Sequence, residues 1–254
     1  MTVVGCSGSV PGPASPASCY LVRAGWQGRE FNLLLDLGSG ALGPLQRHLH
    51  PAEIDAVVLS HLHPDHCLDL CGLYVWLKHG PAQSRARRLP VHGPSGLGDR
   101  LSRAYAVQQG DGDLAGLLDF GTLADRMTLR LGPFAVTPYL VNHPVEAYGL
   151  RVEADGAVLA YTGDSDSCGA LTPLSTGASL LLADAAFVEG VDTRRGIHLS
   201  ARRAAEAAVE AGGVGRLMLT HLPPWADPQV CRAQAGDVWP GQVELAAPDA
   251  THEL

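Results

Sequence analysis

The 254-residue sequence has almost no lysine, no long apolar segment and no regular cysteine spacing. Lysine occurs once, at Lys78, and the formal net charge is −8, which disfavours nucleic acid because such binding relies on Lys and Arg contacts to phosphates. No apolar run approaches the roughly 18 residues of a transmembrane segment, and residues 1–5 lack the basic and apolar regions of a signal peptide. The six cysteines fit neither a zinc ribbon nor a disulfide framework. We therefore expect a soluble, cytoplasmic protein without a membrane partner.

Strand-like and helix-like segments alternate along the chain. The expected strands cover residues 2–5, 18–23, 31–37, 56–60, 89–92, 127–131, 134–141, 148–153, 157–162, 179–183, 217–220 and 243–246, and the expected helices cover 68–78, 98–108, 200–211 and 227–235. Asp155-Gly156 predicts a hairpin turn, and residues 110–121 are expected to form a flexible loop near the site. Two facing sheets with helices outside, a four-layer αββα sandwich of the α/β class, satisfy this order. The length and the 46% hydrophobic content fit a single domain over residues 1–254.

The most informative motif is His61-Leu62-His63-Pro64-Asp65-His66, which directly follows the apolar run at 56–60. Imidazole and carboxylate are ligands that suit zinc, iron and manganese. Ligands two residues apart on an extended segment point the same way, so His61 and His63 are placed to hold one ion together. Asp65 and His66 stand where the next helix begins, face a different direction, and so suit a second ion. The motif predicts half of a two-metal site.

Three further candidate ligands each follow a strand-like segment: His143, Asp164 and His221. A dinuclear site needs about this many, because each ion takes three or so protein ligands and a carboxylate is shared. Taken singly, each has an ordinary explanation, such as a hydrogen-bonded structural histidine or a turn at Gly163-Asp164. Asp36 also has two explanations: it orients a ligand histidine, or it caps a turn at Gly38.

The complete pattern resembles the metallo-β-lactamase superfamily over nearly the whole chain. It is similar to the ribonuclease Z-like branch at Gly5-Cys6-Ser7-Gly8-Ser9, Leu35-Asp36-Leu37-Gly38, Tyr161-Thr162-Gly163-Asp164, His198-Leu199-Ser200 and Leu219-Thr220-His221. Closer still, residues 5–10 with Ser15-Pro16-Ala17-Ser18, and Thr220-His221-Leu222-Pro223-Pro224-Trp225, resemble the actinobacterial atypical class II cyclic nucleotide phosphodiesterases.

This resemblance implies a role for each site residue. It assigns His61, His63 and His143 to the first metal, Asp65, His66 and His221 to the second, and Asp164 to the bridge between them. It makes His198 the general acid and Asp65 a ligand that also accepts a proton from the attacking water. Relatives usually carry a Glu that orients the catalytic histidine, whereas this chain has the shorter Asp184, which leaves the contact to His198 open. The implied cofactors are two divalent ions, Zn²⁺ first, with Mn²⁺ and Fe²⁺ as alternatives.

The resemblance also implies a function: hydrolysis of 3′,5′-cyclic nucleotides, such as cyclic AMP to 5′-AMP. The substrate would be a small phosphodiester, and the two ions would activate the attacking water.

One alternative function is that of a ribonuclease Z-like transfer RNA 3′ endonuclease. The acidic charge opposes it, as does the short segment between His143 and Asp164, where those enzymes extend a long arm. A lactone or ester hydrolase has the same ligand set. Hydrolysis of β-lactams is disfavoured because no cysteine stands beside a ligand strand. A metal-stabilised binding protein would be expected to lack a ligand or His198. The sequence leaves the oligomeric state open, a homodimer included.

Overall fold

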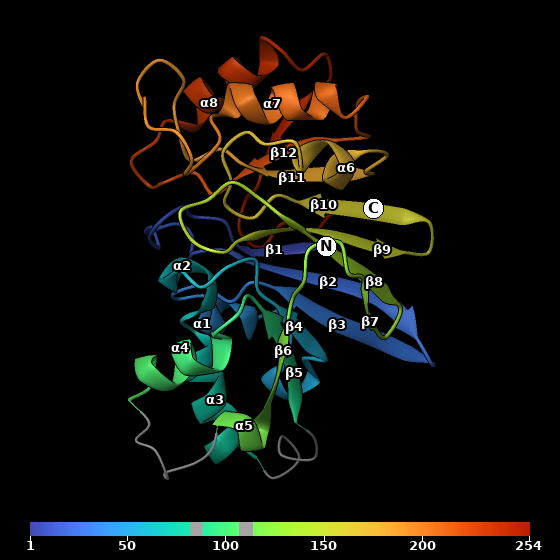
Figure 1. Cartoon of the computed structure of the whole chain (residues 1–254). Coiled ribbons are helices and arrows are strands. Elements are labelled where there is room, and N and C mark those ends of the chain that lie inside the picture. Colours follow the sequence, from blue (N-terminus) through green and yellow to red (C-terminus); the bar gives the residue numbers. More distant parts are fainter. Residues whose placement is uncertain (82–87, 107–113) are drawn as a thin grey trace.

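The computed structural model describes residues 1–81, 88–106 and 114–254, and it has the expected αββα arrangement (Figure 1). The first sheet has the order β1 (Thr2–Gly5), β2 (Cys19–Trp26), β3 (Arg29–Leu35), β4 (Ala56–Val58), β5 (Leu89–Gly93), β6 (Leu118–Thr122). The second has the order β13 (Val243–Leu245), β12 (Leu217–Thr220), β11 (Leu180–Asp184), β10 (Ala157–Tyr161), β9 (Tyr148–Ala154), β8 (Phe134–Leu140), β7 (Leu129–Leu131).

Both sheets combine an antiparallel part with a parallel part. Strands β1 to β3 pair antiparallel, and β3 to β6 pair parallel. In the second sheet β7 to β10 pair antiparallel, and β10 to β13 pair parallel. The carboxyl ends of neighbouring parallel strands lie at one edge of a sheet, which is where such folds place ligand sites. Residues after β3 and β4, and after β10, β11 and β12, are therefore brought to shared edges.

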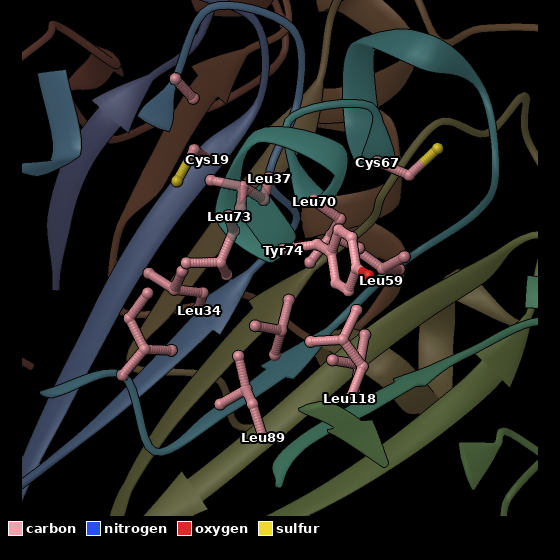
Figure 2. Close-up of a cluster of buried hydrophobic side chains, with 14 of the residues drawn as sticks. Cys19, Leu34, Leu37, Leu59, Cys67, Leu70, Leu73, Tyr74, Leu89 and Leu118 are labelled. Carbon is pink, nitrogen blue, oxygen red and sulfur yellow. The ribbon is translucent and has the colours of Figure 1, made fainter. Parts of the chain in front are cut away.

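Helices cover the outer face of each sheet (Figure 1). The first sheet carries α1 (Leu42–Leu45), η1 (Pro51–Glu53), α2 (Pro64–Cys67), α3 (Leu70–His79), α4 (Leu97–Ala104) and α5 (Leu114–Leu117). The second carries α6 (Leu171–Ser175), α7 (Ala201–Glu210) and α8 (Pro228–Gly236). Side chains alternate between layers with the two-residue period of a strand: Leu34 faces the helices, whereas Leu33 and Leu35 face the other sheet. Figure 2 shows Leu34, Leu89 and Leu118 of the first sheet packing beside the α3 side chains.

Most expected elements are present, and one expectation is wrong. The Asp155-Gly156 hairpin is confirmed: it joins β9 to β10, with a positive φ at both residues (50° and 82°), as a tight hairpin requires. The wrong expectation is the loop at 110–121. Its first part, up to residue 113, lies outside the described residues, and its remaining part, from 114 onward, forms α5 and the edge strand β6. Leu114 and Leu118 are buried in the core under the helices, and this burial orders the segment. Among the described residues, no helix combines the length and apolar character needed to cross a bilayer.

Candidate metal centre

The structure brings all seven predicted ligands together between the carboxyl ends of strands from the two sheets. His61 and His63 follow β4, Asp65 and His66 lie in α2, and the remaining three follow β8, β10 and β12. The predicted ligands form two groups whose ligand atoms lie within 4.8 Å of one another, and Asp164 belongs to both; it also forms a third such group with Asp184 and His198. The first group comprises His61, His63, His143 and Asp164, and the second comprises Asp65, His66, Asp164 and His221.

In the first group, three histidine nitrogens converge. His63 Nδ1 lies 3.0 Å from His61 Nε2 and 3.1 Å from His143 Nε2, and His61 Nε2 lies 3.6 Å from Asp164 Oδ2. Burial lowers the pKa of all three histidines, most strongly for the fully buried His61, whose neighbour His66 adds to the effect. Three neutral imidazoles therefore face one point, and neutral imidazole is the form that binds metal ions.

In the second group, the carboxylates of Asp65 and Asp164 lie between two histidines. His66 Nε2 lies 3.2 Å from Asp164 Oδ1 and 3.4 Å from Asp65 Oδ2, and His221 Nε2 lies 3.3 Å from Asp164 Oδ2. His66 Nε2 and Asp164 Oδ1 are buried without a hydrogen-bond partner among the described residues. Because buried polar atoms are almost always satisfied, this adjacent pair fits a bound cation.

The charges of the second group point to the same conclusion. Burial alone would lower the pKa of His66, but the carboxylates of Asp164 and Asp36 raise it well above its usual value. Burial alone would raise the pKa of Asp164, but His221, His66 and His61 hold it well below its usual range. In the metal-free site, protonated His66 thus neutralises the negative charge of the neighbouring carboxylates. A bound cation would neutralise the same charge.

Asp36, which directly follows β3, hydrogen-bonds the ring nitrogen of His66 that faces away from the metal position. His66 Nδ1 donates to Asp36 Oδ2 over 2.7 Å, which leaves Nε2 to face the metal position. Asp36 is fully buried and also accepts hydrogen bonds from Ser60 N (2.7 Å), Ser60 Oγ (2.8 Å) and Tyr161 Oη (2.7 Å). Its φ of 59° is unusual for a residue other than glycine. Of the two explanations open from the sequence, the structure supports the histidine partner.

Three other ligand histidines also have their second ring nitrogen engaged, among them His61, whose Nδ1 lies 3.1 Å from Ser60 Oγ. His143 Nδ1 donates to Ile197 O over 2.8 Å, and His221 Nδ1 lies 3.1 Å from Ser18 Oγ. Such contacts fix the ring orientation and present the opposite nitrogen to the metal position. The sequence did not single out Ser18, Ser60 or Tyr161 for these roles, because their contacts are made across long sequence separations or look like core packing.

Asp184, the last residue of β11, does reach His198 despite its short side chain. His198 Nδ1 donates to Asp184 Oδ2 over 2.9 Å, and Asp184 is itself fixed by the backbone N–H groups of Ser165 (3.2 Å) and Ala186 (3.0 Å). Burial alone would lower the pKa of His198, but Asp184 raises it to about 9. The ring is therefore protonated at neutral pH in the metal-free protein.

The His198 ring lies beside both metal groups. Its centroid is 5.6 Å from that of His143 and 5.4 Å from that of His221. With Nδ1 engaged by Asp184, the other ring nitrogen is the one free to carry a proton to a substrate. This geometry suits a proton donor.

An N-terminal loop packs against the segment that carries His221. Gly8 N donates to Leu222 O over 3.0 Å, and a Cβ at Gly8 would lie 2.0 Å from the carbonyl oxygen of His221, so glycine is required there. Ser9 N donates to His221 Nε2 over 3.2 Å, a hydrogen bond that a cation bound to this nitrogen would replace. Residues 5–18 and 220–225 thus meet at the second metal group. Trp225, at the end of that segment, is 72% exposed.

A family model, the β-lactamase superfamily domain, matches residues 31–222. The chain belongs to the β-lactamase superfamily. Within it, the chain is 41% identical over 256 residues to the uncharacterized protein Rv1339 of Mycobacterium tuberculosis, covering 100% of this chain and 92% of that protein. It is 31% identical over 247 residues to YhfI of Bacillus subtilis, named a probable metallo-hydrolase, covering 97% and 96%. The YhfI crystal structure superposes with a TM-score of 0.86, at 28% identity, over 99% of this chain and 98% of that one.

This superfamily member is also similar to ribonuclease Z of Mycobacterium bovis, with 29% identity over 283 residues that cover 96% of this chain and 94% of that enzyme. The chain therefore lies in the branch that contains YhfI and ribonuclease Z. Family membership and the His/Asp groups together support metal-dependent hydrolysis as the general activity.

Proposed function

We propose that this protein is a dinuclear metal-dependent phosphodiesterase that hydrolyses 3′,5′-cyclic AMP to 5′-AMP. The supporting observation is that two segments far apart in the sequence contact each other beside the second metal group. Residues 5–18 and 220–225 carry the resemblance to cyclic nucleotide phosphodiesterases. They contact each other at His221, through the Ser9 and Ser18 hydrogen bonds, and at Leu222, through the Gly8 hydrogen bond. Both segments contact residues of the second metal group, so the residues that carry this resemblance stand where we expect a substrate to be recognised.

The residues present fit the implied metal ions. The first ion would be held by His61, His63 and His143, the second by Asp65, His66 and His221, and Asp164 would contact both. Two divalent ions, Zn²⁺ before Mn²⁺ or Fe²⁺ for such donors, would supply an activated water at neutral pH and neutralise charge on a phosphoryl oxygen.

Two side chains of the protein are placed to transfer the protons that hydrolysis requires. Burial alone would raise the pKa of Asp65, but His66 and His221 lower it, so the side chain is a carboxylate that can accept a proton from the attacking water. The departing 3′-oxygen needs a proton, and His198, oriented by Asp184, is placed to donate it. His198 is then reprotonated from solvent.

A small diester suits this molecule better than RNA does. The segment between His143 and Asp164 is the compact β9–β10 hairpin, with no arm to grip a transfer RNA. The net charge of −8 opposes a polyanion, whereas a singly charged substrate needs only the local field of the site. The 29% identity to ribonuclease Z supports transfer RNA processing as the second candidate, and the lactone or ester hydrolase shares the same ligand set.

The deciding experiment compares three substrates at one concentration of zinc-loaded enzyme: cyclic AMP, a precursor transfer RNA and a lactone. We expect 5′-AMP from cyclic AMP, with weak salt dependence, and little cleavage of the RNA or the lactone. His198→Ala is the matched control for contaminating activity. Efficient 3′ processing of the RNA, with cyclic AMP intact, would establish the second candidate and refute the first.

A further inference from the structure

A buried ion pair lies behind the metal centre, between Asp166 and Arg203. Asp166 is 1% exposed and follows the shared ligand Asp164 by two residues, while Arg203 is 7% exposed and lies in the first turn of α7. Arg203 Nη1 donates to Asp166 Oδ1. Burying two charges is costly, and a buried pair often stabilises a fold no more than apolar residues would. The neighbours of this pair indicate a more specific role.

Asp166 connects three loops of the site. Its N–H donates to Asn142 O over 2.8 Å, one residue before His143. Its Oδ2 accepts hydrogen bonds from Gly196 N and from Arg195 Nε, both over 2.7 Å, two and three residues before His198. Asp166 thus connects the loops of Asp164, His143 and His198 at one point.

Arg203 holds the backbone of His198 itself. Its Nη1 also donates to His198 O over 3.2 Å, and its Nε donates to Ser200 Oγ (3.2 Å) and Glu189 Oε2 (3.3 Å). The rigid guanidinium makes these bonds at the same time, which a lysine ammonium on a flexible chain does less well. Residues 188–197, which precede His198, contain no helix or strand, so these anchors fix a segment without regular secondary structure of its own.

We propose that Asp166 and Arg203 are positioning residues for His198: the ion pair fixes the backbone at 196–198 so that the His198 ring keeps its contact with Asp184 and its place beside the metal groups. The catalytic consequence rests on the proposed function. A misplacement of about 1 Å can reduce a rate about 100-fold, so a pair that never touches the substrate can still control turnover.

The kinetic experiment uses Arg203→Met, with Arg202→Met as the matched control. Arg202 lies on the same helix, but its side chain is 40% exposed and pairs with Asp237 at 3.4 Å. Two diesters that differ only in leaving group, thymidine 5′-phenyl phosphate and its 4-nitrophenyl analogue, separate acid catalysis from general damage. We expect Arg203→Met to lose about 10- to 100-fold in kcat with the phenyl ester but less than about threefold with the nitrophenyl ester, which needs little acid assistance.

A double-mutant comparison tests whether Arg203 acts through His198. In a His198→Ala background, Arg203→Met should cause no further loss with the phenyl ester, because the group that it positions is already absent. Equal losses with both esters, or a full additional loss in this background, would overturn the proposal. Because the esters contain no cyclic nucleotide, an enzyme that cleaves them but not cyclic AMP would refute the cyclic nucleotide assignment alone.

A spectroscopic readout needs no activity. In metal-free protein labelled with ¹⁵N-histidine, the Nδ1–H signal of His198, identified by its loss in His198→Ala, reports the hydrogen bond to Asp184. We expect this signal to be broadened or lost in Arg203→Met and retained in Arg202→Met. An unchanged signal in Arg203→Met would refute positioning. If Arg203→Met does not fold, Arg203→Lys takes its place, with a partial loss of the signal and of kcat expected.

Discussion

Replacing Asp36 by Asn tests the central support of the metal site. The carboxylate accepts four hydrogen bonds of 2.7 to 2.8 Å, two of them from Ser60 and one each from His66 and Tyr161. An amide has one acceptor oxygen and directs an NH₂ donor at the remaining donors. Hydrogen bonds to a charged group contribute about 1.5–3 kcal/mol, against about 1 kcal/mol for neutral ones. We therefore expect Asp36→Asn to lower the free energy of unfolding of the metal-free protein by about 2–5 kcal/mol.

The same change should weaken metal binding at the second group. His66 loses the anionic partner that orients its ring, and loss of such a partner typically costs 10- to 100-fold in metal affinity, or about 1.4–2.7 kcal/mol. Chelator competition measures the affinity, and denaturant unfolding of the metal-free protein measures the stability.

Asp55→Asn is the matched control for this experiment. Asp55 is also buried, accepts hydrogen bonds from Asn32 N (2.9 Å) and from Arg29 (2.8 Å), and stands before β4, at the end opposite the metal site. It should lose stability with metal affinity unchanged. If Asp36→Asn loses stability in the same way and binds two ions as tightly as the unmodified protein, the assignment of Asp36 as a metal-site support is refuted.

Other predictions concern the ligands and the acid. His143→Ala should reduce bound zinc from about two ions per chain toward one by elemental analysis, and full metal content would remove His143 from the site. His198→Ala should lose about 10²- to 10⁴-fold in kcat on cyclic AMP with its metal content intact. In the metal-free protein, the pKa of His198 is raised from 6.5 to about 9, so its stabilisation is fully present below pH 6.5 and is lost as the pH rises to 9. Unfolding free energy should decline over this window by roughly 3 kcal/mol more in the unmodified protein than in His198→Ala, and parallel pH profiles would contradict the shift.

The sequence by itself determined where most elements lie and which residues reach the site. Apolar runs such as 56–60 and 217–220 are local patterns that form buried strands, and ligands placed directly after them lie at strand ends. Asp155-Gly156 predicted its hairpin because the turn conformation depends on these two residues alone. By contrast, the Gly- and Asp-rich composition of 110–121 predicted a loop, and burial of Leu114 and Leu118 in the core orders the described part, from 114 onward, as α5 and β6.

Tertiary structure decided which polar residues support the ligands. Tyr161 and Asp36 are separated by 125 positions, and Ser18 and His221 by 203, so no local pattern marks either pair. The reach of the short Asp184 to His198 depends on the path of two loops, which is set by contacts between residues far apart in the sequence, such as Arg203 to Asp166. Residue type and position after a strand are local properties, so the sequence predicts which residues bind the metal ions. The orientation of these side chains depends on contacts that form only when the two sheets pack together.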